Sequence, residues 1–472
     1  GDYAMKESRE RIRAAVQNSG FEYPTQQIVV NLAPNDRPKE GATAELAMVV
    51  AILIASGQID KNMGDKVVFI GSLSLDGTLH SPSGLMNCVI EARRIVKDYA
   101  IAIPSAALKE VECIPGLNAY PLESLADLRN LTKMKSNRSL NTHFRPEKKK
   151  PMFNMSEIIG QEKAKLGLAY AASGKHHTVM MGSPGTGKTM LARAFAGILP
   201  PLDLNQSLET SRIYSACGLL QGRLVQDVPF RSPHHTSSEI ALVGGGPFPR
   251  PGEASLAHNG VLFLDELLEF RSSTLQTLRE PLEERKITIS RVRAAAVFPA
   301  DFILLGAANP CRCGYLFSPG KTCVCATSQI RLRQQKITGP FLDRISLEIE
   351  TLEEPGGVFM QNGVEKSSEW WLSKVMEARV RMKFRNGPKS NSRLLIQNML
   401  PVYTQFSRWQ KIVDHHADFY GLSRRGIMNS LRLALTIMDF RETSSMTEEI
   451  LEEAFSFRAI ASFQKSNPEL VA

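Results

Sequence analysis

The stretch of sequence that decides the fold is Gly182-Ser183-Pro184-Gly185-Thr186-Gly187-Lys188-Thr189. It matches the pattern G-x-x-x-x-G-K-[ST] in full, and it lies between an apolar run at 178–181 and a helix-forming run at 190–199. In such a strand–loop–helix setting the glycines let backbone N–H groups turn toward a phosphate, and the helix N-terminus adds its positive dipole. The sequence therefore predicts a nucleotide-binding loop in which Lys188 reaches the β- and γ-phosphates and the Thr189 hydroxyl coordinates Mg²⁺.

A second acidic motif follows in the run Val261-Leu262-Phe263-Leu264-Asp265-Glu266. Four apolar residues followed by two carboxylates predict a buried strand with acids at its carboxyl end, which is where parallel α/β sheets bind their ligands. We expect Asp265 to hold Mg²⁺, directly or through water, and Glu266 to orient and deprotonate the attacking water. A protein that binds a nucleotide without hydrolysing it would not need the second acid.

Two further residues are candidates for the same reaction. The apolar run 302–310 predicts a neighbouring strand that ends at Asn309, whose amide can position water or contact the γ-phosphate. Arg344 lies in the separate run 339–350, and an arginine supplied to a neighbouring subunit's nucleotide stabilises transition-state charge. Each residue also has an ordinary alternative, because an Asn-Pro pair is usually a turn and an Asp-Arg pair is usually a surface ion pair.

Taken together, these motifs resemble the core of AAA+ ATPases. Within that resemblance Asn309 matches sensor 1, Arg344 matches the arginine finger, and Arg425 in the run Leu422-Ser423-Arg424-Arg425 matches the sensor 2 arginine of a helical lid. The block 230–267 closely resembles the signature of the magnesium-chelatase-like ComM/YifB family. The resemblance implies an α/β protein that binds ATP and Mg²⁺, forms a homo-oligomeric ring, usually a hexamer, and hydrolyses ATP between subunits.

For the ComM branch of that family, the resemblance further implies a DNA partner. The activity would be branch migration, or helicase-type remodelling of branched or single-stranded DNA, during recombination or natural transformation and alongside recombination proteins. Two other functions stay open. One is a magnesium-chelatase-type ATPase subunit, and the other is an ATP-gated assembly scaffold that does not act on DNA.

The chain is expected to divide into a Lon-protease-like α/β domain, a basic exposed linker, an ATPase core and a helical lid, at 1–131, 132–151, 152–355 and 356–472. Sequence patterns in the first domain predict a strand, a helix, a hairpin, a second helix and a second strand, at 27–34, 44–57, 66–79, 84–98 and 100–104. The clearest lid helices are expected at 368–384 and 424–440.

The resemblance to Lon places Thr43 and Met86 where that protease has its serine and lysine. Because methionine cannot act as a base, no peptidase activity is expected.

Four of the seven cysteines are clustered in the pattern Cys311-x-Cys313-x₉-Cys323-x-Cys325. Four thiolates can bind Zn²⁺ tetrahedrally, and a site closed by four protein ligands is structural. The alternatives are reduced thiols without a metal, or redox chemistry. His234 and His235 fall in an inserted loop with no third ligand nearby in the sequence, so a metal role is not expected for them.

A basic hairpin is the expected point of contact with DNA. The run 284–293 alternates like a hairpin strand, and in the magnesium-chelatase-like clade such a hairpin often points into the ring pore. Lys286, Arg291 and Arg293 are therefore candidates for phosphate contacts, which hold a strand without reading its sequence. A solvated basic hairpin is the alternative.

Composition sets only broad limits on function. The 472 residues include 57 Lys and Arg against 48 Asp and Glu, a net charge of +9, and 43% are apolar, as in a globular protein. A basic balance is compatible with a polyanion partner such as nucleic acid. The longest apolar stretch, 46–55, is too short to span a bilayer, and the polar start of the sequence does not read as a signal peptide. A cytoplasmic protein without a membrane partner is expected.

Overall fold

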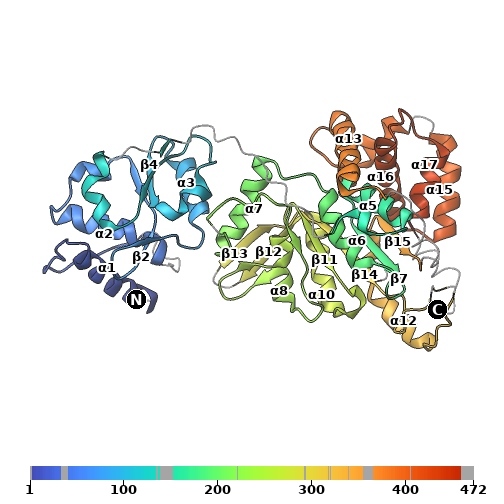
Figure 1. Ribbon diagram of the computed structural model, residues 1–472, viewed down its shortest axis with the longest axis horizontal. Coiled ribbons are helices and arrows are strands. Elements are labelled where there is room, and N and C mark those ends of the chain that lie inside the picture. The colour runs from blue at the N-terminus through green and yellow to red at the C-terminus, as the bar shows by residue number, and fades with distance from the viewer. Residues whose placement is uncertain are drawn as a thin grey trace. The chain divides into compact units, whose positions relative to one another are not determined.

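The computed structural model describes residues 3–32, 41–133, 137–138, 153–220, 222–291, 294–316, 318, 320–337, 340–353, 365–403 and 406–458. The chain divides into two compact units, Gly1–Glu147 with Leu202–Gln226, and Lys148–Pro201 with Asp227–Ala472. Figure 1 labels many of the helices and strands of both units. Each unit has hydrophobic clusters of its own, so each is described by itself.

The first unit is built on a four-stranded sheet of order β1-β4-β5-β6. Its strands are β1 (Val67–Phe69), β4 (Ala100–Pro104), β5 (Asn118–Leu122) and β6 (Asn137–Arg138), of which the first three run parallel. The α-helices described in this unit are α1 (Tyr3–Asn18), α2 (Glu45–Ala55), α3 (Leu85–Ile95), α4 (Leu108–Val111) and α7 (Leu204–Ala216), and β2 (Ser72–Leu73) and β3 (Leu79–His80) form a hairpin. The buried carboxylate of Glu45 accepts hydrogen bonds from Ser8 Oγ at 2.8 Å and Arg11 Nε at 3.1 Å, which joins α1 to α2 through a satisfied charge.

The structure confirms the helices expected at 44–57 and 84–98 and the strand at 100–104 as α2, α3 and β4. The strand expected at 27–34 is wrong over its described part, because residues 27–32 pair with no strand and Val29 is 83% exposed. Alternating side chains favour a strand only where a neighbouring sheet edge is free to pair with it. Of the expected linker, 137–138 pairs with β5 as β6, and residues 134–136 and 139–151 lie outside the described part of the chain.

Residues Leu202–Gln226 were expected in the ATPase core, yet they cluster with the first unit. Leu204 and Leu208 of α7 pack against the cluster that contains the fully buried Met86. Asn87 Nδ2 donates to the carbonyl oxygen of Arg212 at 2.9 Å, and Arg212 Nε donates to Asn87 Oδ1 at 3.0 Å. A sequence pattern does not say which of two cores a helix will cover, so this placement could not be read from the chain.

The second unit contains a five-stranded parallel sheet of order β15-β7-β14-β11-β8. Its strands are β7 (Thr178–Gly182), β8 (Phe230–Arg231), β11 (Val261–Leu264), β14 (Ile303–Ala308) and β15 (Leu347–Thr351). Successive side chains enter two different cores: Met180, Phe263 and Leu305 join one cluster, and Val179, Leu262 and Leu304 join the other. The expected parallel α/β sheet, covered on both faces, is confirmed.

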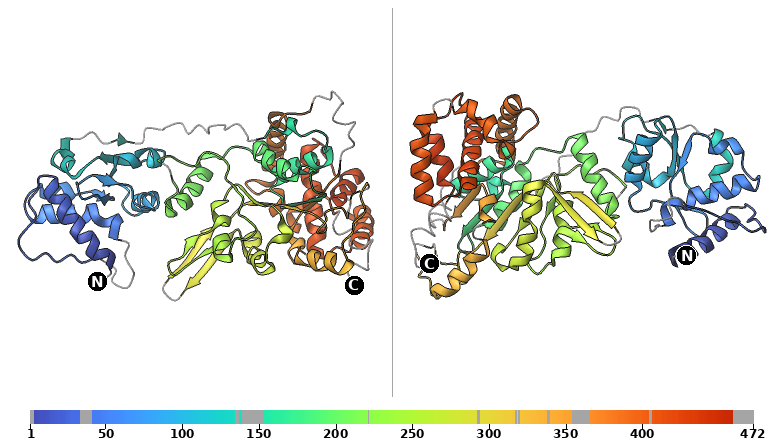
Figure 2. Two further views of the ribbon diagram at one scale, coloured as in Figure 1. Left: turned by 60° about the horizontal axis from the view of Figure 1, so that its bottom comes forward. Right: turned by 180° about the vertical axis from the view of Figure 1, so that it is seen from behind.

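The elements around this sheet are α5 (Glu162–Gly174), α6 (Lys188–Phe195), α8 (Glu239–Val243), β9 (Gly244–Gly245), β10 (Arg250–Pro251), α9 (Glu253–Leu256), α10 (Ser272–Thr277), α11 (Arg279–Glu284) and α12 (Thr327–Gln334). The expected basic hairpin is also present, as the antiparallel pair β12 (Lys286–Arg291) and β13 (Ala294–Pro299). Figure 2 shows this hairpin, in yellow, extending away from the sheet of its unit.

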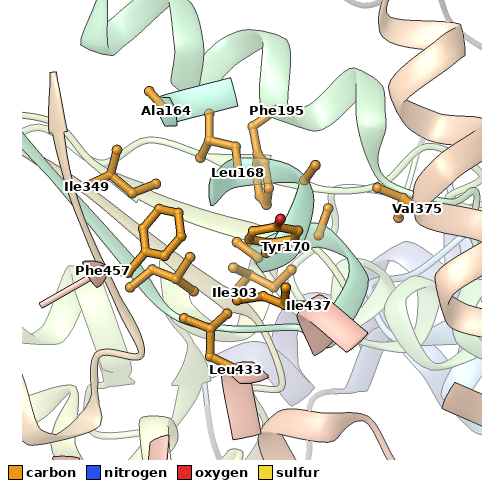
Figure 3. Packing of buried hydrophobic residues seen from close by; sticks show 14 of the residues in the cluster. Ala164, Leu168, Tyr170, Phe195, Ile303, Ile349, Val375, Leu433, Ile437 and Phe457 are labelled. Atoms are coloured by element: carbon orange, nitrogen blue, oxygen red, sulfur yellow. The ribbon is translucent and has the colours of Figure 1, made fainter. Parts of the chain in front are cut away.

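The C-terminal region is helical, as expected, with α13 (Ser368–Asn386), α14 (Ile396–Met399), α15 (Phe406–Tyr420), α16 (Arg424–Phe440) and α17 (Glu448–Ser456). Val375, Leu433 and Ile437 pack in one cluster with Leu168 of α5 and Phe195 of α6 (Figure 3). The C-terminal helices and the sheet layer therefore share a core. Among the described residues, no helix is both long and apolar enough to cross a membrane.

Candidate active site

The predicted phosphate-binding loop lies where β7 meets α6. Strand β7 is buried along its whole length and ends at Gly182, and α6 begins at Lys188. Gly185 and Gly187 have φ values of +83° and +80°, in the left-handed region that suits glycine. A Cβ atom on Gly182 would lie 2.1 Å from the carbonyl oxygen of Thr351 on β15. The path of the backbone therefore requires glycine at these positions.

The ammonium group of Lys188 folds over this loop. Its Nζ donates hydrogen bonds to the carbonyl oxygens of Gly182 at 2.8 Å and Ser183 at 2.7 Å. Burial lowers the pKa of Lys188 to about 8, although the negative charge of Asp265 opposes the shift. A bound phosphate would favour the charged form of Lys188, because an anion close to an ammonium raises its pKa.

The affinity for ATP is therefore expected to fall as the pH rises through about 8. A lysine with a pKa near 8 is charged at pH 7 and mostly neutral at pH 9, so apparent affinity should weaken about tenfold over that interval if only the charged form binds. Titration with a fluorescent ATP analogue at each pH measures the effect. Lys188→Ala removes the titrating group and should bind weakly without this decline. Parallel declines in the wild-type protein and the variant would contradict the expectation.

The predicted magnesium ligands lie together beside the loop. Thr189 Oγ1 donates to Asp265 Oδ2 at 3.0 Å, and the other carboxylate oxygen accepts the backbone N–H of Glu266 at 3.0 Å. Asp265 follows directly after β11, so the register of the sheet sets its position next to α6. Hydroxyl and carboxylate oxygens are the hard ligands that Mg²⁺ prefers. The residues therefore fit a bound Mg²⁺, which would neutralise phosphate charge there.

Glu266 lies at the exposed end of the same strand. Its φ of 51° is uncommon for a residue other than glycine, and its side chain is 58% exposed. His235 Nδ1 lies 3.2 Å from Glu266 Oε2, and the ring of His234 lies 4.1 Å from that of His235. Sequence reasoning gave this histidine pair no role. The contact arises because β8 pairs in parallel with β11, which brings the loop after β8 to the acidic end of the sheet.

A cavity of about 530 Å³ joins these groups, within the usual size range of small-molecule sites. Of the predicted residues it is lined by Pro184, Gly185, Gly187, Lys188, Thr189, Asp265, Glu266 and Asn309. Thr186 is buried behind the loop, where its hydroxyl donates to the carbonyl oxygen of Ser183 at 2.9 Å. The cavity is also lined by Glu269, Arg312 and Arg333, which sequence reasoning missed. Arg333 Nη1 lies 2.5 Å from Glu269 Oε1.

The two other predicted arginines do not line this cavity. Arg344 and Arg425 both form ion pairs with Oε1 of Glu283 on α11, each at 2.6 Å. Ser423 Oγ, at the start of α16, donates to Asp343 Oδ1 at 2.7 Å, so the segments that carry the two arginines are joined. The structure thus brings the two arginines together on Glu283, and neither lines the nucleotide cavity of its own chain.

The hairpin residues are only partly described. Lys286 lies at the base of the hairpin, opposite Pro299, and its Nζ is 3.9 Å from a carboxylate oxygen of Glu284. Arg291 is the last residue of β12, and nothing is described of its side chain; Arg293 lies outside the described residues. Lys286 and Arg291, which the sequence grouped as phosphate contacts, therefore lie at opposite ends of β12.

The four clustered cysteines lie close together in the structure. The ligand atoms of Cys311, Cys313, Cys323 and Cys325 all lie within 4.8 Å of one another. A hydrogen bond from the backbone N–H of Tyr315 lowers the pKa of the Cys313 thiol to about 6, whereas burial raises the pKa of the Cys311 thiol to about 12. The cluster begins two residues after Asn309 and is thus continuous with one wall of the cavity.

Three family models match the chain. They are described as magnesium chelatase, subunit ChlI, at residues 154–357, subunit ChlI of Mg-chelatase at residues 1–106, and the ChlI C-terminal region at residues 365–458. Together they match residues in both compact units and in the C-terminal helices.

Relatives of nearly full length support the same assignment. YifB of Escherichia coli (strain K12) is 38% identical over 464 residues, which cover 97% of this chain and 90% of YifB. Competence protein ComM of Haemophilus influenzae is 36% identical over 474 residues, with the same coverage of 97% and 90%. The 67 kDa subunit of magnesium chelatase from Chlorobaculum parvum is 29% identical over 161 residues, 34% of this chain and 24% of that subunit. The chain therefore belongs to the magnesium-chelatase-like family of AAA+ ATPases that includes YifB and ComM.

Proposed function

We propose that the protein is an ATP-hydrolysing ring motor that drives branch migration of DNA. The observation that carries this proposal is that only some of the predicted charged residues line the nucleotide cavity. Lys188, Asp265 and Glu266 line it. Arg344 and Arg425 do not line it, and both pair with Glu283. Because neither arginine lines the cavity of its own chain, we propose that both complete the site of a neighbouring subunit. Such head-to-tail contacts close into a ring when the rotation between subunits permits, and we propose a hexamer.

Hydrolysis in this arrangement divides into binding, activation and charge stabilisation. Lys188 holds the β- and γ-phosphates, and the Thr189 hydroxyl and the Asp265 carboxylate would hold Mg²⁺ on them. Glu266 accepts the proton of the attacking water, while the amide of Asn309 orients that water or the γ-phosphate. Arg344 of the next subunit stabilises the charge that develops on the transferred phosphoryl group, and Arg425 assists it from the lid.

The similarity to competence protein ComM over 97% of the chain supports the DNA part of the proposal. The hairpin of β12 and β13 adds a second argument, because it extends from its unit and carries Lys286 and Arg291 on one strand. We propose that these two residues and Arg293 contact DNA phosphates, with recombination proteins acting on the same substrate in the cytoplasm. Contacts of this kind hold a strand in any sequence and weaken as salt increases.

The test is ATP-dependent branch migration of a synthetic Holliday junction with mobile arms. With ATP and Mg²⁺, the wild-type protein is expected to convert the labelled junction into forked products on a gel. The ATPase rate should rise more with four-way or forked DNA than with linear duplex. Lys188→Ala is the matched control, because it removes the phosphate-binding cation and should abolish conversion. If the protein neither converts the junction nor shows a DNA-stimulated ATPase rate at any of a range of salt concentrations, the proposal is contradicted.

A second candidate function is that of a magnesium-chelatase ATPase subunit. It is favoured by the 29% identity to the 67 kDa magnesium-chelatase subunit, although that match covers only 34% of this chain. The discriminating measurement is insertion of Mg²⁺ into a porphyrin in the presence of the other chelatase subunits, followed by porphyrin fluorescence. Insertion without any response to branched DNA would favour this candidate over the DNA motor.

A further inference from the structure

The cysteine cluster has the spacing of a metal site. The Sγ atoms of Cys311 and Cys313 are 3.3 Å apart, and Cys323 Sγ lies 3.6 Å from each of them. A tetrahedral centre with zinc–sulfur bonds of about 2.3 Å requires sulfur atoms about 3.8 Å apart. The backbone N–H of Cys313 also lies 3.3 Å from Cys325 Sγ, and that of Gly314 lies 3.2 Å from Cys311 Sγ. Such N–H donors support thiolate ligands from the second shell of a metal centre.

Packing alone does not account for this cluster. A cysteine without a chemical role is usually buried as a small apolar side chain. Here only Cys311 is buried, whereas Cys313, Cys323 and Cys325 are half-exposed, and all four are free thiols. Partly exposed thiols that converge to within 4.8 Å of one another repel when ionised, so a dication that binds all four would stabilise the arrangement.

The cluster is built onto the nucleotide site. Gly314, with a φ of +85°, packs so closely on the phosphate-binding loop that a Cβ atom there would lie 2.3 Å from Pro184 Cδ. Arg312 stands between the first two cysteines, is exposed, and lines the nucleotide cavity. Within the described ranges, no ion pair or hydrogen bond engages the Arg312 side chain. This cation, which has no partner among the described residues, lies beside the Lys188 loop and is available for an anionic ligand.

The second arm of the cluster leads into the same cavity. Two residues after Cys325, α12 begins, and this helix places Arg333 on the cavity wall. The neighbouring Gln334 is 4% exposed, and its Nε2 donates to the carbonyl oxygen of Pro310 at 3.4 Å. A metal that joins Cys311 and Cys313 to Cys323 and Cys325 would thus fix both the strand end that carries Asn309 and the helix that carries Arg333.

We propose that the four cysteines bind one Zn²⁺ ion and that this centre holds Arg312 in the nucleotide cavity, where its guanidinium contacts the phosphates of ATP bound to the same chain. The zinc is structural, because four protein ligands leave no open position. Its role is to turn an exposed loop into a rigid support for a phosphate-binding arginine. The inference relies on ATP binding in this cavity, which is part of the proposed function, but it does not depend on any action on DNA.

Metal analysis tests the first half of the proposal. Protein purified without chelator is expected to contain one zinc per chain, as measured by elemental mass spectrometry of the digested protein. The double variant Cys323→Ser/Cys325→Ser should contain none. Wild-type protein without zinc, or with iron bound in its place, would overturn the zinc assignment.

Titration with a fluorescent ATP analogue tests the second half. Arg312→Ala and the double cysteine variant should each weaken binding about tenfold or more, the usual scale for one charge-assisted hydrogen bond. Lys321→Ala is the matched control, because it removes a cation of the same loop that pairs with Glu353 and does not line the cavity. Its affinity should stay within about twofold of wild type, as expected for an exposed pair.

The zinc assignment and the role of Arg312 in ATP binding can each be overturned without the other. Unchanged affinity in Arg312→Ala would overturn the role of the arginine, even if zinc is present. If the double cysteine variant does not fold, as judged by circular dichroism, the zinc content of wild type and the affinity of Arg312→Ala still decide both halves. Neither measurement contains DNA, so a protein that binds zinc and ATP as expected but fails on Holliday junctions would contradict only the proposed function.

Discussion

Arg344→Ala is expected to lower kcat for ATP hydrolysis by about 10³–10⁵-fold, the range by which arginine fingers accelerate phosphoryl transfer. Binding of a fluorescent ATP analogue should change little, because Arg344 does not line the cavity of its own chain and pairs instead with Glu283 at 2.6 Å. The expected signature is therefore a loss in kcat with retained affinity. Equal losses in affinity and kcat would point to a role in the chain's own site.

Mixing two inactive variants separates action within a chain from action between chains. Lys188→Ala weakens nucleotide binding and lacks the phosphate-binding cation but keeps Arg344, whereas Arg344→Ala keeps nucleotide binding but lacks the arginine. In a randomly mixed ring with equal amounts of each, about a quarter of the interfaces would combine an intact Lys188 with an intact Arg344 from the neighbour. Mixing should therefore restore ATPase activity that neither variant has alone. No recovery, in rings shown to exchange subunits, would contradict supply of Arg344 by the neighbour.

The nucleotide site was largely predictable from sequence because its chemistry is local. The loop from Gly182 to Thr189 carries in one stretch the glycines and the cation that phosphate binding needs. The pair Asp265 and Glu266 follows four apolar residues, which favour a buried strand. Parallel strands present their carboxyl ends at one edge of a sheet, so the two motifs are expected at the same edge. The hydrogen bond of 3.0 Å between Thr189 and Asp265 is the result.

What sequence reasoning missed depends on long-range pairing. His235 reaches Glu266 only because β8 is the neighbour of β11, and a strand of two residues leaves little pattern to read. Arg312 is visible in the sequence between two cysteines, but the sequence does not show that it lines the nucleotide cavity. That placement depends on how Gly314 packs on Pro184. The strand predicted at 27–34 does not form over residues 27–32 for a different reason. The side chains there alternate as they do in a strand, but no sheet edge among the described residues pairs with them.

Glu266→Gln is expected to lower kcat by about 10²–10⁴-fold, the usual contribution of a general base. Glutamine has the same size as glutamate and keeps a side-chain oxygen that can contact His235. The substitution therefore removes the basic carboxylate and changes little else. Asp265 and Thr189 keep their contact of 3.0 Å, and binding of ATP with Mg²⁺ should persist. Steady-state phosphate release and titration with the fluorescent analogue measure the two effects. Near-normal hydrolysis by this variant would contradict a base role for Glu266.

The contact between His235 and Glu266 allows a sharper form of the same test. If His235 only holds Glu266 in position through its contact of 3.2 Å, His235→Ala should lower kcat far less than Glu266→Gln. The double variant should then be no slower than Glu266→Gln alone, because a positioning residue has no effect once the group it positions is inactive. Additive losses would instead show that His235 acts on water or phosphate independently, which would make the loop after β8 part of the catalytic machinery rather than its support.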